Sequence, residues 1–295
     1  MRVRRILGAV LLVLFLFSGL AGASVTVTDT RDQVKGGIGL NTGKQNILLR
    51  YNSPVDKEGK RVWSEPSIGL GFGPDTPNWY GKGAGFLAFE LNGKNILLDS
   101  GAEVTIIDQG GKKGVIRFSW KHPVADVDLT AVVLENDDKL MLEFSLNPKI
   151  EVSSIRLTLL NYPGGMTEEG KARDRWIATA KRNVQHDAKV ILDKDEFWVY
   201  YYDANLNPVA FGSSALMLKK DLSVEAEVEV CEYPVYTILT YPGDARKIRF
   251  ALWKLPKGTN WKDGLEEMRG FVEKAQSDLV NESFGPSKKT EIKPR

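Results

Sequence analysis

Cysteine and histidine are scarce in this chain of 295 residues, which argues against disulfides, a catalytic thiol and a zinc site. There is one cysteine, Cys231, and there are two histidines, His122 and His186. A single cysteine cannot form an internal disulfide, and no histidine lies close enough in sequence to suggest a catalytic thiol. Neither histidine has a second His or Cys three to five residues away, as a zinc site requires. We therefore expect no metal and no cofactor.

Long apolar runs are absent after the first 23 residues. Arg2, Arg4 and Arg5 precede an apolar stretch over residues 6–20, and the small residues 21–23 follow it. This layout predicts a signal peptide over residues 1–23, and hence export to the periplasm, the cell surface or the medium. The stretch is shorter than the ~20 residues that span a bilayer, although an uncleaved anchor is the alternative. No later segment predicts a membrane span.

A strong charge of either sign is also absent. The chain has 40 basic and 38 acidic side chains, which gives +2. The predicted signal peptide holds three of the arginines and no acid, so the remaining chain has 37 basic and 38 acidic side chains, or −1. A near-neutral protein lacks the basic surface that nucleic acids attract, so no nucleic-acid partner is expected.

Most of the chain has the pattern of β-strands. Short runs of β-branched and aromatic residues alternate with polar ones and are separated by Gly, Asn, Asp and Pro. Asn92-Gly93, residues 109–113 and residues 136–138 predict three hairpins. The expected strands cover residues 46–51, 85–91, 96–98, 104–107, 114–120, 127–135, 139–146, 154–160, 188–192, 197–202, 215–218, 223–230, 236–241 and 247–253. They are too many for a single immunoglobulin-like sandwich.

One segment near the C-terminus has a helical period instead. The apolar residues from Trp261 to Leu279 recur every three or four positions, which predicts a helix over about 261–279 that Asn260 can cap. Residues 285–295 predict a polar tail. The predicted fold is all-β: a large antiparallel two-sheet sandwich, supersandwich-like, with one C-terminal helix, in a domain over residues 24–284. Two smaller sandwiches meeting near residues 147–148 are the alternative.

A glycine- and proline-rich loop over residues 69–85 is the first candidate site. Asp75, Trp79 and Tyr80 lie in it. Flat aromatic rings stack on the C–H faces of sugars, while carboxylates hold sugar hydroxyls, so these residue types predict a ligand-contacting loop. The alternative is that Trp79 and Tyr80 pack the loop onto the core.

A charged segment over residues 163–182 is the second candidate. It contains Arg173, Asp174, Arg175 and Trp176. Guanidinium groups match planar oxyanions, so the two arginines predict a grip on an acidic sugar, and Asp174 is a candidate acid or base. The alternative is a solvated loop with weak surface ion pairs.

Together these features predict an exported β-sandwich protein that binds extracellular carbohydrate or assists its processing, with polysaccharide as its partner. One alternative is a sugar-active enzyme (epimerase, lyase or hydrolase) that uses His122, His186, Asp174 and Glu169. Another is a non-catalytic envelope-interaction protein, which predicts an exposed apolar patch or a long unpaired sheet edge. The ligand and the oligomeric state stay open.

Overall fold

The structure is a computed structural model, and it confirms the all-β class. It describes residues 24–30, 37–52, 67–72, 79, 86–99, 102–163, 174–185, 188–205, 213–220, 223–231, 234–254 and 260–287. The predicted signal peptide and residues 288–295 of the predicted tail lie outside these ranges. Within them, the chain forms two antiparallel sheets and two helices.

The larger sheet has 13 strands, and every neighbouring pair in it is antiparallel. From one edge to the other its strands are β13 (Asn183–Gln185), β12 (Arg175–Ala178), β15 (Trp198–Asp203), β16 (Ser214–Leu218), β19 (Lys247–Lys254), β10 (Lys139–Pro148), β9 (Ala125–Leu134), β8 (Lys113–Lys121), β7 (Glu103–Gly111), β1 (Val25–Asp29), β2 (Ile38–Asn41), β3 (Asn46–Asn52) and β4 (Ser67–Phe72).

The smaller sheet has six strands, also antiparallel. In order they are β14 (Ala188–Ile191), β17 (Glu225–Val230), β18 (Val235–Pro242), β11 (Ser154–Asn161), β5 (Leu87–Leu91) and β6 (Lys94–Asn95).

The main core lies between the two sheets. Side chains alternate across each strand, so one set from every long strand points inward. Phe144 of β10 stacks on Phe89 of β5 across the gap, with ring centroids 4.2 Å apart and planes 13° apart. The inner side chains of β1–β3 join the same core, among them Val25, Leu40 and Ile47. The described chain is therefore a two-sheet sandwich, as predicted.

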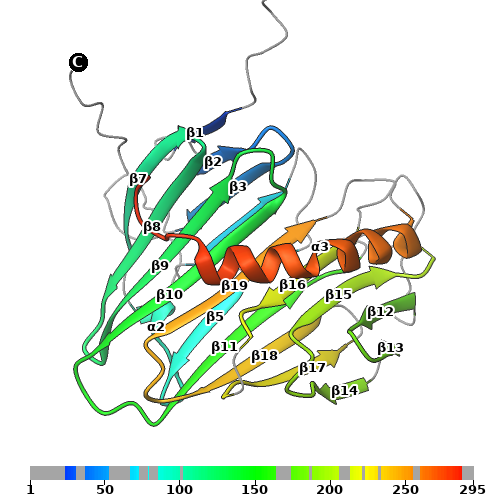
Figure 1. Ribbon diagram of the computed structural model, residues 1–295. Coiled ribbons are helices and arrows are strands. Elements are labelled where there is room, and N and C mark those ends of the chain that lie inside the picture. The colour runs from blue at the N-terminus through cyan, green and yellow to red at the C-terminus, as the bar shows by residue number, and fades with distance from the viewer. Residues whose placement is uncertain are drawn as a thin grey trace, which may run out of the picture.

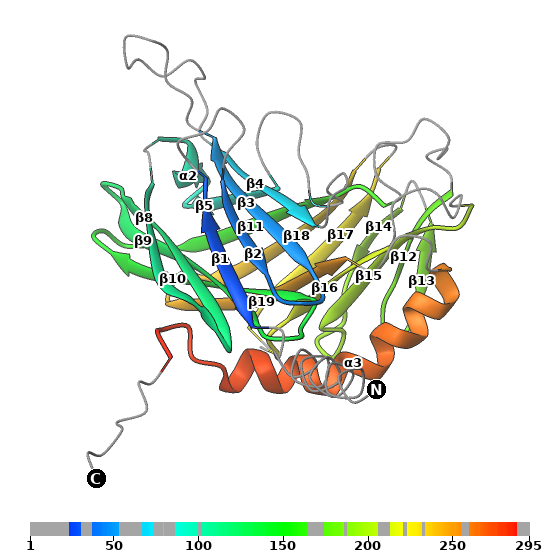
Figure 2. The same cartoon turned by 90° about the horizontal axis from the view of Figure 1, so that it is seen from above.

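A second apolar layer covers the outer face of the large sheet. The helix α3 (Trp261–Asn281) buries Leu265, Met268, Ala275 and Leu279 against outward-facing residues of that sheet. Figure 1 shows α3 crossing the front of the large sheet, and Figure 2 shows it along the outside, with the small sheet on the other side. The Asn260 side chain caps the helix by accepting the Lys262 N–H at 2.9 Å. The helix begins at the expected residue and ends two residues beyond the expected 279.

The hairpin at Asn92-Gly93 is confirmed, because both residues have positive φ, 51° and 78°. The strand expected over residues 96–98 is wrong. After β6 the chain turns into the short helix α2 (Ile96–Asp99), and the Asn95 side chain accepts the Leu97 N–H at 3.1 Å. An Asn side chain that accepts a backbone N–H at this position favours the start of a helical turn.

Candidate functional site

The structure brings the two candidate segments to the same end of the sandwich. Trp79 forms an isolated antiparallel bridge with Asn161, the last residue of β11, and packs edge-on against Tyr201 of β15, with centroids 5.3 Å apart. Two residues beyond Tyr201, Asp203 lies opposite Arg175 of β12. Asp75, Tyr80, Arg173, Glu169 and His186 lie outside the described residues.

Trp79 is enclosed rather than open to a ligand. Its side chain is 0% exposed. Around it is a buried polar layer, in which Asn161 Nδ2 donates to Ser214 Oγ at 2.8 Å and Tyr201 shares a hydrogen bond with Thr237 at 2.6 Å. Burial raises the pKa of the Tyr201 phenol well above its usual range, so this layer is uncharged. The described position of Trp79 corresponds to the alternative in which it packs the loop onto the core.

Arg175 points into the space between the sheets. It is 3% exposed, and its neighbour across the strand pair, Asp203, is 2% exposed. Burial raises the pKa of the Asp203 carboxyl, and the charge of Asp174 raises it further. The hydrogen bond from the Asn205 N–H and the charge of Arg175 oppose this rise in the pKa. The guanidinium group is thus part of the interior beside a buried carboxyl, and its side chain is not open to solvent.

Trp176 lies on the opposite face of β12 and is half-buried. Its ring stacks on Tyr202 of β15, with centroids 6.4 Å apart and planes 14° apart. Tyr202 stacks in turn on Trp261 at the start of α3, with centroids 4.5 Å apart. Burial raises the pKa of Tyr202 to about 12, so the middle ring is a neutral phenol at ordinary pH. These three parallel rings hold the Trp176 side chain in one orientation.

The edge strand β13 places two amides beside this ring. Gln185 lies directly across from Trp176, and Asn183 lies across from Ala178. Val184 between them packs toward the inter-sheet core, so both amides are on the same face as Trp176, and both are exposed. We call the surface formed by Trp176, Asn183 and Gln185 the Trp176 edge. Neither amide was among the predicted site residues. The alternation of polar and apolar residues over 183–185 is typical of a strand, and this pattern could have indicated that both amides lie on one face.

The basic residues of the hairpin between β12 and β13 already have acidic partners. Lys181 Nζ lies 2.6 Å from Asp195 and 2.9 Å from Asp193, and Arg182 lies 2.5 Å from the buried Glu196. Their charges are therefore balanced within the protein.

The candidate acid–base residues that the structure describes lie far apart. His122 is buried at the turn after β8, where its Nδ1 accepts the Val124 N–H at 3.1 Å. Asp174 immediately precedes β12. The sheet order separates β8 from β12 by six strand spacings, or roughly 29 Å along the sheet at ~4.8 Å per spacing. These two residues cannot share one substrate atom.

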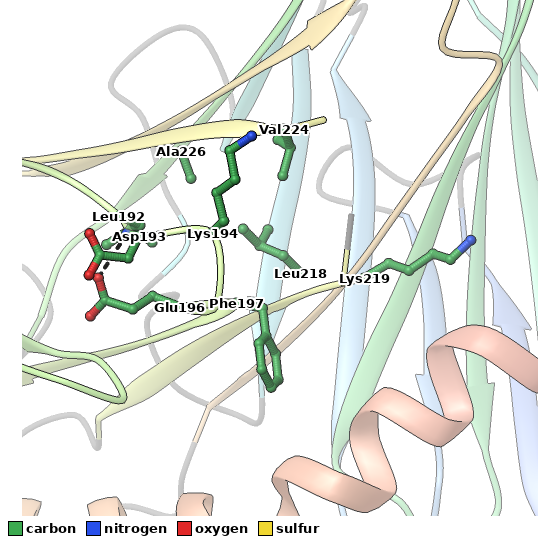
Figure 3. A pocket seen from close by; sticks show the side chains of 9 residues that line it. All are labelled: Leu192, Asp193, Lys194, Glu196, Phe197, Leu218, Lys219, Val224 and Ala226. Carbon is green, nitrogen blue, oxygen red and sulfur yellow. Dashed lines mark hydrogen bonds between the residues drawn. The ribbon is translucent and has the colours of Figure 1, made fainter. Parts of the chain in front are cut away.

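A small cavity opens between the sheets near Phe197. It is lined from the small-sheet side by Leu192, Val224 and Ala226 and from the large-sheet side by Phe197 and Leu218. Figure 3 shows Lys194 beside it, with Asp193 and Glu196 joined by the 2.9 Å hydrogen bond from the Asp193 N–H. Its volume of about 20 Å³ fits a water molecule and not a sugar ring.

Other kinds of site have little support in the part of the chain that the structure describes. No three His, Cys, Asp or Glu side chains gather there as a metal site would need. Neither described helix combines the length and apolar character that crossing a membrane requires. The large apolar side chains that are more than half exposed, Ile150, Ile191 and Val280, come from three different parts of the chain. Scattered single residues of this kind are ordinary.

No protein-family model matches the chain, and no curated protein matches it in sequence. Solved structures resemble it in fold. An alpha-N-acetylgalactosaminidase from Bifidobacterium bifidum is 9% identical, with a TM-score of 0.53 over 82% of this chain and 41% of that one. A xanthan lyase from Paenibacillus is 7% identical, with a TM-score of 0.51 over 84% of this chain and 26% of that one. The chain thus spans less than half of either enzyme, and what it shares with these carbohydrate-active enzymes is the sandwich fold.

Proposed function

We propose that this protein is an exported carbohydrate-binding protein and that the Trp176 edge is its binding surface. The observation that carries the proposal is the half-buried Trp176 ring, fixed by stacking and flanked by two exposed amides on one face. The sandwich fold shared with carbohydrate-active enzymes supports the choice of ligand. Export is proposed from the basic and apolar residues 2–23 of the sequence.

The chemistry of the Trp176 edge suits a sugar. A sugar ring offers apolar C–H groups on its faces and hydroxyls around its rim. The indole of Trp176 offers a flat apolar surface, and each amide both donates and accepts hydrogen bonds. Because Tyr202 and Trp261 already fix the ring, binding costs little additional side-chain entropy. The surface therefore provides both stacking and hydroxyl recognition.

The charges that the structure describes around the Trp176 edge favour a neutral sugar. The predicted grip on an acidic sugar needs open guanidinium groups. Of the two arginines, Arg175 is buried on the other face, and Arg173 lies outside the described residues. Lys181 and Arg182 are held by acidic partners in the adjoining hairpin. An acidic sugar would have to displace these partners, whereas a neutral sugar needs only the ring and the amides.

Replacing Trp176 with alanine tests the proposal. Trp176→Ala is expected to weaken binding of neutral glycans at least tenfold, equivalent to ~1.4 kcal/mol, because the stacking surface is lost. Trp176→Phe keeps a smaller ring and should retain part of the affinity. Binding to glycans found on an array would be measured by titration calorimetry.

The matched control is Ile191→Ala, which removes an exposed apolar side chain from the other sheet. It should leave binding unchanged. Circular dichroism would verify that each variant is folded. If Trp176→Ala binds every glycan as tightly as the wild type, the Trp176 edge is not the binding surface.

A further inference from the structure

A second hollow lies on the outer face of the N-terminal strands. It is a groove of about 260 Å³ lined by outward-facing residues of β1, β2 and β3, namely Thr26, Thr28, Gly39, Asn41, Asn46 and Leu48. Leu40 and Ile47 also line it, although their side chains belong to the core on the inner face. The groove has more than ten times the volume of the cavity near Phe197. We call it the Gly39 groove.

The strand register explains the hollow. Gly39 lies between Thr28 on β1 and Leu48 on β3. Because glycine has no side chain, the surface is hollow at Gly39, between the side chains of Thr28 and Leu48. The next row on the same face consists of Thr26, Asn41 and Asn46. The groove is thus a depression between Thr28 and Leu48, beside a row of hydroxyl and amide groups.

We infer that the Gly39 groove is a second binding site for a neutral saccharide, distinct from the Trp176 edge. None of the eight described residues that line it carries a charge. Thr26 and Thr28 offer hydroxyls, Asn46 and Asn41 offer amides, and all four are exposed. Leu48 offers an apolar flank for the C–H face of a sugar. The volume is slightly below the ~300–1,000 Å³ of sites for drug-sized ligands, which suits about one or two sugar rings.

The two sites belong to one sheet but lie at its opposite ends. The strands β12 and β13 form one edge of the 13-stranded sheet, and β1–β3 lie near the other edge. The helix α3 packs on β15, β16 and β19 between them, and Figure 1 shows β1–β3 and β12–β13 on either side of it. Two separate contacts let one protein hold a long polysaccharide at two points, which raises the effective affinity without strengthening either contact. The choice of a saccharide ligand rests on the proposed function.

Filling the groove tests the inference. A Cβ built on Gly39 would lie 3.8 Å from the nearest atoms of Thr28, an ordinary contact, so Gly39→Val can be accommodated and would occupy the hollow. Thr28→Val removes one lining hydroxyl while keeping the side-chain shape. Gly270→Ala, on the helix with nothing within 4 Å of the added Cβ, is the matched glycine control.

Binding of maltose, cellobiose and lactose would be followed by saturation-transfer NMR in the wild type, in Trp176→Ala, and in Trp176→Ala combined with each groove variant. We expect Trp176→Ala to retain part of the signal, and Gly39→Val to reduce that remainder at least tenfold. Thr28→Val should reduce it severalfold, and Gly270→Ala should leave it unchanged.

Three results would overturn the Gly39 groove as a site: no binding of these sugars by the wild type, no remaining signal in Trp176→Ala, or a remaining signal that Gly39→Val and Thr28→Val leave intact. The second result would leave the proposed function standing. Conversely, if Trp176→Ala has no effect and the addition of Gly39→Val to it abolishes binding, the groove is supported and the Trp176 edge is not.

Discussion

Replacing Phe144 with alanine is expected to lower the free energy of unfolding by about 3 to 5 kcal/mol. Phe144 is 0% exposed and belongs to the large sheet. Its ring stacks on Phe89 of the small sheet at 4.2 Å and on Phe250 of the neighbouring strand at 6.4 Å. The substitution would remove the ring that joins the two sheets. The folded state would then lose the transfer free energy of the buried ring, and the cavity left behind would destabilise it further.

Denaturant unfolding of the wild type and Phe144→Ala would measure this difference. The control is Ile191→Ala, whose side chain is 56% exposed and which should change the stability by less than about 0.5 kcal/mol. If the two variants have the same stability, the stacked rings do not hold the sheets together.

Replacing Asp137 with asparagine is expected to have a comparable effect, because Asp137 belongs to a ring of four alternating charges beneath the C-terminal half of α3. Lys139 Nζ lies 2.6 Å from Asp137 and 3.4 Å from Asp278. Lys274 Nζ lies 2.6 Å from Asp278 and 3.6 Å from Asp137. The ring joins the turn between β9 and β10 to the helix.

Asp137→Asn would leave the buried Lys139 ammonium with only its more distant partner. Breaking a buried pair in this way typically costs about 3 to 5 kcal/mol. The neighbouring Asp138 is the matched control. Burial and the charge of Asp137 raise the pKa of the Asp138 carboxyl, so its charge is unfavourable in the folded state. Asp138→Asn should therefore leave the stability at pH 7 unchanged or higher.

The same ring predicts a pH dependence. Burial alone would raise the pKa of Asp137, but the charge and hydrogen bonds of Lys139 outweigh it and hold the pKa below its usual value. A carboxylate with a lowered pKa stabilises the fold above its unfolded pKa of about 3.9 and loses that contribution as the pH falls through its folded pKa. Denaturation curves at pH 7 and pH 3 should show that the free energy of unfolding falls less on acidification in Asp137→Asn than in the wild type. Equal losses would contradict the account.

Much of the fold could be predicted because the strands have clear local patterns. The alternation of charged and apolar residues in β17 and the positive-φ dipeptide at Asn92-Gly93 act over a few neighbouring residues. The strands β1, β2, β4, β12 and β13 were missed, and the loop expected over residues 69–85 is wrong for residues 69–72, which belong to β4. For β12 the reason is physical. Arg175 looks like a loop residue in sequence, but the fold buries it opposite Asp203, a residue that is distant from it in sequence.

The candidate site was predictable only in part for the same reason. Trp176 was singled out from the sequence, but Tyr202, which stacks on it, and Trp261, which stacks on Tyr202, come from a strand and a helix farther along the chain. Gln185 becomes its neighbour only through the strand register. A tryptophan in a glycine-rich loop can face a ligand or the core, and local sequence does not distinguish the two. Trp79 faces the core.

The central claim is that a neutral sugar binds on the Trp176 edge, and a crystal structure with the tightest-binding neutral oligosaccharide tests it most directly. The account predicts a sugar ring stacked on Trp176, with hydroxyls within about 3 Å of the amides of Asn183 and Gln185. An oligosaccharide bound elsewhere in the protein, with the Trp176 ring uncovered, would contradict it.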